Sequence, residues 1–209
     1  MYIAQRTLRF VNGVLKSYGP PNIKRLLWDK EFSGEKWKFI DNTIGDCVYP
    51  FLGKYIHKGD ILDLGCGPGN TANELDAAAY RTYVGVDISE AALSKATKRT
   101  ERKGRADKNR FVCADFLSYV PTQQFDVILF RESMYHVPLG KIKAMLDRYS
   151  NYLRAQGVFV VRMNTTDGKS GKSKSRPTAM VRIIETEFNV LEERQHGESG
   201  PTVIVFRPM

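Results

Sequence analysis

Cysteine and histidine are scarce in this chain, and no long hydrophobic run occurs in it. Cys47, Cys66 and Cys113 lack the spacing of a metal site, and their odd number does not suit a disulfide framework. We interpret them as reduced packing residues and expect no metal. No apolar run is long enough to span a bilayer, and basic residues interrupt the N-terminal segment where a signal peptide needs an apolar core. We therefore expect a cytoplasmic protein without a membrane partner.

Acidic residues are also few relative to basic ones, since 32 Lys and Arg oppose 23 Asp and Glu for a formal net charge of +9. A basic patch can attract phosphate or nucleic acid. The excess is concentrated in two clusters. The first has no interleaved aromatic residues and fits a solvated helix face better, whereas the second lies in a Gly/Ser-rich segment that we interpret as a loop near the substrate. The first comprises Lys95, Lys98, Arg99, Arg102, Lys103, Arg105, Lys108 and Arg110, and the second comprises Lys169, Lys172, Lys174 and Arg176.

The most informative motif is a glycine-rich turn that follows an apolar segment within residues 61–69. Gly65, Gly67 and Gly69 occupy alternate positions, where they let the backbone turn sharply and let a ligand come close. The dinucleotide fingerprint needs its third glycine one position later, where this chain has Asn70. A pyrophosphate is therefore not the favoured ligand, and a glycine turn without any ligand is the alternative.

Acidic residues accompany the first three predicted strands. Asp63 lies within the strand before the glycine turn, and Asp87 and Asp115 end the next two apolar runs. The carboxyl ends of parallel strands meet at one edge of a sheet, where doubly wound folds bind ligands, and an acid placed like Asp87 can bind ribose hydroxyls. For a single acid the alternative is a helix cap, because Asp87 precedes Ser89 at a plausible helix start.

In this order and spacing, the glycine turn and the acids resemble class I S-adenosylmethionine-dependent methyltransferases, from about Asp60 to the C-terminus. The resemblance implies that the turn packs against the methionine part of S-adenosylmethionine, that Asp87 holds the ribose hydroxyls, and that Asp115 hydrogen-bonds the adenine amino group. It also implies that Asp63 orders the loop and that the backbone of Arg131 contacts the methionine end. The cofactor-binding set expected on this basis is Asp63, Gly65, Cys66, Gly67, Gly69, Asp87, Ile88, Asp115, Phe116, Arg131 and Trp37.

Residues 1–58 precede this pattern, and we expect them to form a helical cover on a methyltransferase domain at residues 59–209. Apolar residues from Ile3 to Leu15 have helical spacing, and Gly19-Pro20-Pro21 ends that helix. In the aromatic segment Trp28–Trp37, the rings either line a ligand cleft or anchor the segment to the core. A further helix is predicted at about residues 43–55.

From residue 59 onward strands and helices alternate, which indicates a parallel sheet covered on both faces. A helix near residues 178–188 precedes two strands joined by a short loop, and such a terminal hairpin is typical of the methyltransferase family that the motifs resemble. We predict an α/β fold with a doubly wound, mostly parallel seven-stranded sheet and a C-terminal antiparallel hairpin, which is a Rossmann-like methyltransferase fold. The predicted strands are residues 60–66, 82–88, 110–116, 125–131, 157–163, 189–194 and 202–206.

The segment after the fourth strand supplies the candidate catalytic residues Glu132, Tyr135 and His136. Methyl transfer from a sulfonium is an in-line displacement, so an enzyme mainly aligns the reactants and excludes water. A hydroxyl acceptor needs a base, for which histidine is suited and His136 is the candidate. An amine acceptor needs a carboxylate or tyrosine to orient it, and Glu132 is the candidate. The alternatives for His136 are a helix cap or a wall of the pocket.

We predict S-adenosylmethionine-dependent methyl transfer to an oxygen or nitrogen of a small molecule, such as a metabolite, sugar or natural-product intermediate. The alternatives are an RNA methyltransferase, motivated by the basic charge, and a cofactor-binding homologue without catalysis. No Asn/Asp-Pro-Pro-aromatic motif and no Pro-Cys nucleophile follow the fourth strand, and Arg131 and Glu132 replace the acid of magnesium-dependent catechol methyltransferases. These absences disfavour nucleobase amines, cytosine C5 and metal-dependent transfer. The acceptor and the oligomeric state are open.

Overall fold

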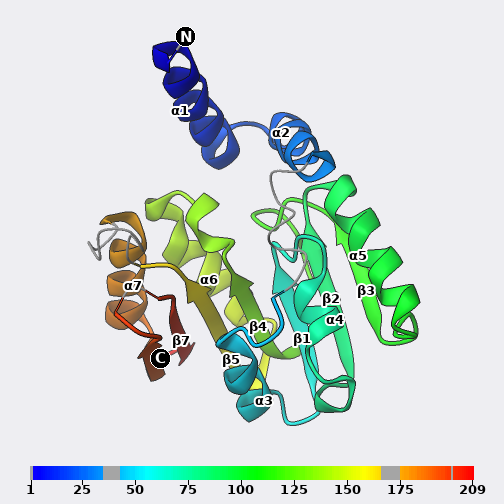
Figure 1. The fold of residues 1–209 in the computed structure, drawn as a ribbon. Coiled ribbons are helices and arrows are strands. Elements are labelled where there is room, and N and C mark those ends of the chain that lie inside the picture. Colours follow the sequence, from blue (N-terminus) through cyan, green and yellow to red (C-terminus); the bar gives the residue numbers. More distant parts are fainter. Residues whose placement is uncertain (1, 35–42, 166–174, 199) are drawn as a thin grey trace.

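The computed structural model describes residues 2–34, 43–165, 175–198 and 200–209. A seven-stranded sheet crosses the centre of the molecule in the order β3-β2-β1-β4-β5-β7-β6 (Figure 1). Strands β1 to β5 run parallel, whereas β7 pairs antiparallel with both β5 and β6. The predicted fold class and its terminal hairpin are therefore confirmed. The strands are β1 (Asp60–Leu64), β2 (Thr82–Asp87), β3 (Asn109–Cys113), β4 (Phe125–Arg131), β5 (Leu153–Met163), β6 (Asn189–Gln195) and β7 (Thr202–Arg207).

Helices cover both faces of this sheet. Helices α3 and α5 pack on one face, and α6 and α7 pack on the other. None of the described helices has the length and apolar character needed to cross a bilayer. The α-helices are α1 (Tyr2–Tyr18), α2 (Pro21–Ser33), α3 (Val48–Ile56), α4 (Asn70–Glu74), α5 (Glu90–Arg102), α6 (Ile142–Ser150) and α7 (Ser175–Glu187), and the short 3-10 helices are η2 (Ala77–Ala79), η3 (Met134–His136) and η4 (Leu139–Lys141).

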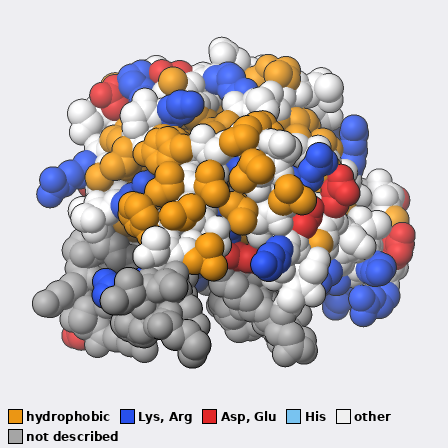
Figure 2. Space-filling view, turned by 90° about the horizontal axis from the view of Figure 1, so that it is seen from above, with side chains coloured by type: hydrophobic (Ala, Val, Ile, Leu, Met, Phe, Trp, Pro, Cys, Tyr) orange, Lys and Arg blue, Asp and Glu red, His pale blue; other side chains and the backbone are white. Residues whose placement is uncertain are grey.

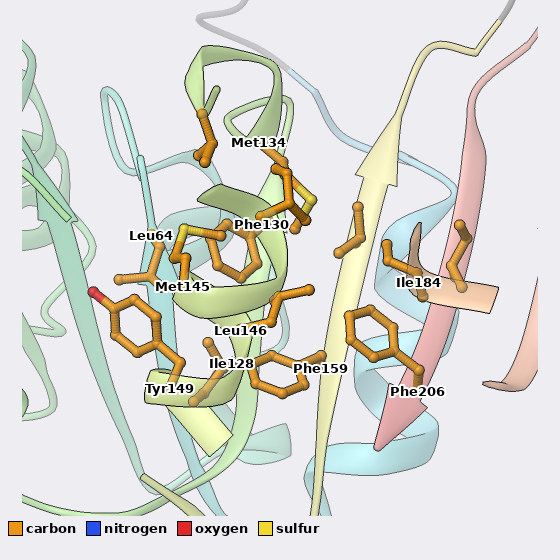
Figure 3. Close-up of a cluster of buried hydrophobic side chains, with 14 of the residues drawn as sticks. Leu64, Ile128, Phe130, Met134, Met145, Leu146, Tyr149, Phe159, Ile184 and Phe206 are labelled. Carbon is orange, nitrogen blue, oxygen red and sulfur yellow. The ribbon is translucent and has the colours of Figure 1, made fainter. Parts of the chain in front are cut away.

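The hydrophobic core lies on both faces of the central strands, because successive side chains of a strand project to opposite sides. In β4, Leu129 joins the cluster beneath α3 and α5, whereas Ile128 and Phe130 join the cluster beneath α6 and α7. Figure 3 shows the second cluster, in which Phe159 of β5 stacks on Phe206 of β7 with ring centroids 5.1 Å apart. Burial on both faces explains why β4 is a continuous apolar run in the sequence.

Helices α1 and α2 stand above the carboxyl ends of the strands (Figure 1). Helix α1 packs on α2, and α2 packs on α5. The predicted break between the first two helices is confirmed at Pro20 and Pro21, and Pro21 lies in the first turn of α2, where its missing N–H costs no helical hydrogen bond. The division into a cover at residues 1–58 and a domain at 59–209 stays a prediction, and α3 of the first segment packs on β4 and β5.

Three predicted boundaries shift for local reasons. Strand β3 ends at Cys113 rather than residue 116, because the side chain of Asp115 accepts a backbone N–H two residues on and starts a turn. The helix predicted from residue 43 begins at Val48, whose N–H donates to Oδ1 of Asp46. Strand β5 begins before residue 157, because the chain already pairs with β4 ahead of an irregularity in that ladder.

Candidate functional site

A cavity of about 650 Å³ lies between the carboxyl ends of the strands and the cover helices. Pockets of this size hold small organic ligands, and this edge of an open α/β sheet is where such ligands bind. Gly69 packs behind the cavity, and Trp37 lies outside the described residues. The other predicted site residues line the cavity, namely Asp63, Gly65, Cys66, Gly67, Asp87, Ile88, Asp115, Phe116, Arg131, Glu132, Tyr135 and His136.

The glycine turn after β1 adopts left-handed backbone conformations at all of its glycines. At Gly65 (φ +82°) a Cβ would collide with Ser133 Cβ, and at Gly69 (φ +72°) it would lie 2.8 Å from Ala96 Cβ. The N–H of Gly65 also donates to the carbonyl oxygen of Val86 on β2, at 2.7 Å. Close packing on one side of the turn therefore requires glycine at these positions. The opposite side of the turn lines the cavity.

Asp87 is buried at the end of β2 and braces the glycine turn. Its Oδ2 accepts the N–H of Gly67 at 2.8 Å, and its Oδ1 accepts the N–H of Ser89 at 2.9 Å. Burial raises the pKa of Asp87 to about 6, although both hydrogen bonds act to lower it. Helix α5 takes its cap from Ser89, whose Oγ accepts the N–H of Ala92 at 3.1 Å. The carboxylate of Asp87 thus lies at the cavity and is not the cap of that helix.

Asp63 is buried in β1 below the same turn. Its Oδ2 accepts a hydrogen bond from the Tyr83 hydroxyl at 2.6 Å, whereas its Oδ1 has no hydrogen-bond partner among the described residues. Burial raises the pKa of Asp63 to about 6, against the opposing effect of the Tyr83 hydrogen bond. A buried carboxylate oxygen without a partner is costly, and a donor or cation on a ligand would satisfy it. S-adenosylmethionine carries ribose hydroxyls, an ammonium and a sulfonium, so the residues present fit this cofactor.

Asp115 lies in the turn after β3, where its Oδ2 is 2.9 Å from Nζ of Lys24 on α2. Both side chains are nearly buried, with exposed fractions of 10% for Lys24 and 11% for Asp115. The neighbouring Phe116 lines the cavity and meets Phe130 edge-on with ring centroids 6.1 Å apart. The acid that the resemblance assigns to adenine is thus paired with a cation of the cover.

Further contacts hold α2 above the cavity. Oδ1 of Asp29 accepts a hydrogen bond from Ser89 Oγ at 2.7 Å, next to the cap of α5. The ring of Phe32 lies 3.7 Å from where a Cβ on Gly67 would be. Trp28 and Phe32 both line the cavity, and their ring centroids are 5.9 Å apart. The described aromatic residues of the segment Trp28–Trp37 therefore form a wall of the cavity.

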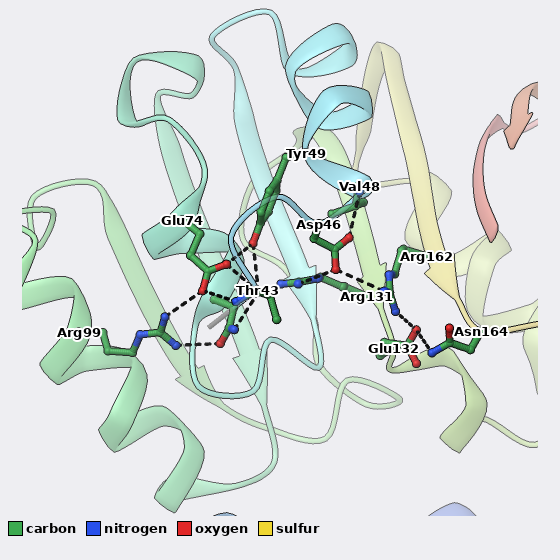
Figure 4. Close-up of polar contacts among 11 residues, drawn as sticks. Thr43, Asp46, Val48, Tyr49, Glu74, Arg99, Arg131, Glu132, Arg162 and Asn164 are labelled. Carbon is green, nitrogen blue, oxygen red and sulfur yellow. Dashed lines mark hydrogen bonds and ion pairs between the residues drawn. The ribbon is translucent and has the colours of Figure 1, made fainter. Parts of the chain in front are cut away.

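Glu132 follows β4 in a left-handed conformation (φ +56°), which is uncommon for a residue with a side chain. Its Oε1 accepts hydrogen bonds from Arg162 Nη1 and from Asn164 Nδ2, the latter at 3.1 Å (Figure 4). Its Oε2 accepts a hydrogen bond from the Tyr135 hydroxyl, which itself accepts the Asn164 N–H at 2.8 Å. Backbone strain of this kind concentrates at functional sites, and here it fixes a carboxylate in the cavity wall.

The side chain of Arg131 is directed toward the segment before α3. Its Nη2 donates to Asp46 Oδ2 at 2.8 Å, and its guanidinium carbon lies 5.4 Å from the centroid of the Tyr49 ring. Nη2 of Arg162 is 3.4 Å from the same oxygen of Asp46 (Figure 4). Burial alone would raise the pKa of Asp46, but these two arginines hold it below its usual value. The backbone role that the resemblance implies for Arg131 stays a prediction.

A second polar network ties the same segment to the helix after the glycine turn (Figure 4). Oε2 of Glu74 accepts hydrogen bonds from Thr43 Oγ1 at 2.6 Å and from the Tyr49 hydroxyl at 2.8 Å. Nη2 of Arg99 donates to Oε1 of Glu74 at 3.1 Å. Together, the two networks fix the segment before α3 against β4, β5 and α4, beside the cavity.

His136 lies in η3 and lines the cavity below α2. Its ring meets Trp28 edge-on with centroids 4.7 Å apart. Burial, together with the nearby cations Lys16 and Arg176, lowers the pKa of His136 to about 4. Nζ of Lys16 lies 3.6 Å from the centroid of a Trp28 ring and 2.6 Å from Glu31 Oε2. The imidazole is therefore uncharged at neutral pH, and its position is that of a pocket wall.

Sequence reasoning missed several residues of this cavity, among them Lys24, Asp46, Arg162 and Asn164. Arg162 carries a signal, because it interrupts the apolar end of β5 where that strand reaches the same edge as Glu132. The sequence gives no such signal for Lys24, because a lysine on an amphipathic helix is usually solvated. Its partner, Asp115, lies far away in the chain and is brought close only by the fold.

Part of the first basic cluster has a structural role. Nη1 of Arg105 donates to the carbonyl oxygens of Ala72 at 2.9 Å and Leu75 at 2.7 Å. Nζ of Lys108 donates to the carbonyl oxygen of Ala77 at 2.8 Å. These bonds satisfy backbone acceptors around α4 and η2. Exposed members of the cluster are Lys98, Arg102, Lys103 and Arg110.

Parts of this chain are similar in sequence to known proteins. Residues 61–157 match the family model described as a methyltransferase domain. Sterol 24-C-methyltransferase erg6 of Aspergillus fumigatus is 30% identical over 102 residues, which are 48% of this chain and 26% of that protein. An mRNA cap guanine-N(7) methyltransferase of Cryptococcus neoformans is 28% identical over 126 residues, which cover 52% of this chain and 20% of that protein. The chain thus spans about a quarter or less of these curated relatives.

Among solved structures, the N-methyltransferase NodS from Bradyrhizobium japonicum WM9 in complex with S-adenosyl-L-homocysteine has a TM-score of 0.66 with this chain. The match covers 88% of this chain and 97% of that chain at 18% sequence identity. A likeness at this identity shows that the fold is shared. The acceptors of these proteins differ, so the fold does not identify the acceptor here.

Proposed function

We propose that this chain, whose residues 61–157 form a class I S-adenosylmethionine-dependent methyltransferase domain, transfers a methyl group from S-adenosylmethionine to a nitrogen or oxygen of a small molecule. The proposal rests on one observation, which is that predicted cofactor-binding residues and candidate catalytic residues line the same cavity. Buried acids and the glycine turn line one part of it, and Glu132, Tyr135 and His136 line another. A ligand held by the first group therefore lies beside the second group.

When bound, S-adenosylmethionine supplies an electrophilic methyl group on a positively charged sulfur. Asp87 binds the ribose hydroxyls, and Oδ1 of Asp63, which has no partner among the described residues, accepts a hydrogen bond at the methionine end. Asp115 shares its carboxylate between Lys24 and the adenine amino group. The resemblance to class I methyltransferases implies these roles, and the burial of Asp63 and Asp87 supports them, because a buried acid needs a polar partner. Apolar and backbone surface in this part of the cavity comes from Gly65, Cys66, Gly67, Ile88 and Phe116.

The other part of the cavity favours an amine acceptor over a hydroxyl. Removing a hydroxyl proton needs a base whose pKa lies near the working pH, whereas burial lowers the pKa of His136 to about 4. A neutral amine needs no such base. With S-adenosylmethionine bound, the lone pair would form the bond to the methyl carbon as the carbon–sulfur bond breaks toward sulfur, S-adenosylhomocysteine would leave, and the extra proton would pass to water. Glu132 accepts an N–H of the amine and orients the lone pair.

An RNA acceptor is the second candidate. The likeness to an mRNA cap methyltransferase and the exposed residues Lys98, Arg102 and Lys103 support it. Against it, Arg99, Arg105 and other cations of the same cluster bind protein groups. Binding of RNA through the exposed cations would weaken steeply with added salt. We propose transfer without a metal, in the cytoplasm, with residues 1–58 as cover of the domain.

The test is a methyl-transfer screen with isotopically labelled donor and the full chain. The panel pairs amines with alcohols of the same carbon skeleton and includes total RNA. We expect label on amines, with S-adenosylhomocysteine formed in equal amount, and no change when a chelator is added. Label confined to RNA would move the assignment to the second candidate. Absence of transfer together with calorimetric binding of S-adenosylhomocysteine would identify a homologue that binds the cofactor without catalysis.

A further inference from the structure

Helix α1 presents its apolar side to solvent. An amphipathic helix of a globular protein normally buries that side against the core. Among the side chains of α1 that the structure describes, Lys16 and Ser17 are buried, with exposed fractions of 8% and 9%, while Phe10 is 73% exposed. The exposed apolar side chains of this helix are Leu8, Phe10, Val11, Val14 and Tyr18.

Specific contacts hold the helix in this orientation. Nζ of Lys16 lies 2.6 Å from Oε2 of Glu31 and 3.6 Å from the centroid of a Trp28 ring, so the polar side of α1 is fixed on α2. At 3.6 Å a cation over an indole ring is attracted by the ring quadrupole. The outward direction of the apolar side therefore follows from how α1 is anchored.

Helix α2, which packs on α1, adds a further exposed apolar side chain, because Leu26 is 65% exposed. Figure 2 looks down on this end of the molecule and shows hydrophobic side chains gathered over its centre, with Lys, Arg, Asp and Glu side chains along the border. Apolar surface gathered in this way marks an interaction site more often than single exposed side chains do. We call Leu8, Phe10, Val11, Val14, Tyr18 and Leu26 the α1 face.

The stretch that forms α1 and the start of α2 carries charge of one sign, and Glu31 and Glu90 pair with its residues Lys16 and Arg25. Residues 1–28 contain no Asp or Glu, so every ionised side chain in this stretch is a cation. Arg6 and Arg25 are exposed beside the α1 face. A second copy of the chain would bring the same positive charge opposite its own, which opposes self-association. A partner with an apolar interior and negatively charged groups on its surface complements both the exposed apolar side chains and the cations. The cations of this stretch are Arg6, Arg9, Lys16, Lys24 and Arg25.

We propose that the α1 face binds an anionic lipid surface, with α1 lying in the plane of one leaflet. Phe10, Val14 and Tyr18 insert between headgroups, and the exposed side chains of Arg6 and Arg25 contact lipid phosphates. This attachment needs no spanning segment, and none of the described helices could supply one. Lys16, Trp28 and other residues of the cover line the cavity, so docking places the cavity at the lipid surface. The inference is independent of methyl transfer.

The test is co-sedimentation of the full chain with phosphatidylcholine vesicles, with and without phosphatidylglycerol. We expect binding to the vesicles that contain phosphatidylglycerol, little binding to phosphatidylcholine alone, and weaker binding at high salt. Phe10→Ser and Val14→Ser should each weaken binding by about tenfold, because an inserted apolar side chain is lost. The matched control is Val120→Ser, which changes an apolar side chain that is 61% exposed outside the α1 face.

Thermal unfolding of each variant checks the fold, which these exposed substitutions should leave unchanged. Absence of binding to either kind of vesicle overturns the proposal. So does equal binding by wild type, Phe10→Ser and Val14→Ser. Concentration-dependent dimers in sedimentation velocity that Phe10→Ser abolishes would assign the α1 face to a second copy and also overturn it. None of these outcomes depends on catalysis, so they are separate from the test of the proposed function.

Discussion

Nζ of Lys24 lies 2.9 Å from Oδ2 of Asp115, and this ion pair joins helix α2 of the cover to the sheet beside the cavity. The exposed fractions of the two side chains are 10% and 11%. The adjacent Arg25 pairs with Glu90 at 3.0 Å, but those side chains are 46% and 67% exposed. Two ion pairs of the same helix therefore differ in burial. Removing one partner of the more buried pair should lower the free energy of unfolding more.

Lys24→Met should lower the free energy of unfolding by about 3 kcal/mol, because it leaves the carboxylate of Asp115 buried without its cation. Arg25→Met should change it by less than about 0.5 kcal/mol, since an exposed pair contributes little. Urea unfolding of the two variants measures both values. Similar effects of the two substitutions would contradict the structural role of the Lys24 pair.

Asp63 should make the stability of the ligand-free chain depend on pH. Burial raises the pKa of its carboxyl group in the folded state from 3.8 to about 6, so the folded protein binds this proton more tightly than the unfolded chain. Near pH 4 and below, this carboxyl group affects stability little, because it is protonated in the folded state and at most partly ionised in the unfolded chain. As the pH rises through 6, ionisation opposes folding by up to about 3 kcal/mol.

Asp63→Asn removes this charge and keeps an acceptor for the Tyr83 hydroxyl. The variant should be more stable than wild type at pH 8 and equally stable near pH 4, as urea unfolding at the two pH values would show. The control is Asp107→Asn, which changes an exposed carboxylate. A stability difference that is the same at both pH values would refute the explanation by burial.

His136 should remain uncharged until the solution is well below neutral pH. Burial and the cations Lys16 and Arg176 lower its pKa to about 4, and NMR titration of the imidazole carbon shifts should have a midpoint near that value. Lys16→Met removes one cation and the ion pair that it makes with Glu31, and both changes favour the imidazolium. The midpoint should therefore rise in this variant. Lys54→Met, at an exposed ion pair with Glu192, is the control and should leave it unchanged.

The sequence predicted the fold well, because its signals are local. Apolar runs of strand length, the Pro20-Pro21 break and the glycine turn each specify backbone geometry within a few residues. Two of the boundaries that shifted depend on side chains that bind the backbone nearby. The carboxylates of Asp46 and Asp115 start a helix and a turn, respectively, and hydropathy does not report such contacts.

The sequence predicted those residues of the candidate site that lie at the end of a recognisable apolar strand. Asp63 and Asp87 were found because each lies on an apolar strand beside the glycine turn. The pairing of Lys24 with Asp115 was not found, because it joins segments that are 91 residues apart. The lowered pKa of His136 was also missed, since it comes from burial under α2 and from cations on α1 and α7. Such effects exist only in the assembled fold.

Asp87→Ala should weaken binding of S-adenosylhomocysteine by at least about a hundredfold, because the proposed ribose contact is lost and the Gly67 N–H loses its acceptor. Isothermal titration calorimetry measures this change. Asp107→Ala, at an exposed position, should bind like wild type. Unchanged affinity in Asp87→Ala would count against the assignment of this acid to the cofactor.

Glu132 should act on the acceptor and not on the cofactor. Its left-handed backbone (φ +56°) and its contacts with Arg162 and Tyr135 fix the carboxylate in the cavity wall. Glu132→Gln keeps the size and one acceptor oxygen but removes the charge that orients an amine. For an amine found in the screen, kcat/KM should fall by about a hundredfold, while the Kd for S-adenosylhomocysteine should stay within about twofold.

The backbone provides a second variant at the same position. Glu132→Gly also removes the carboxylate, but glycine adopts φ +56° without strain, so this variant should be no less stable than Glu132→Gln. If poor turnover came from a disturbed fold, the glycine variant would recover part of it. If turnover needs the carboxylate itself, both variants should be equally slow with amines. Calorimetry with S-adenosylhomocysteine tests whether the cofactor site is intact in both variants. If both variants lose affinity for S-adenosylhomocysteine, the role of Glu132 in acceptor binding is contradicted.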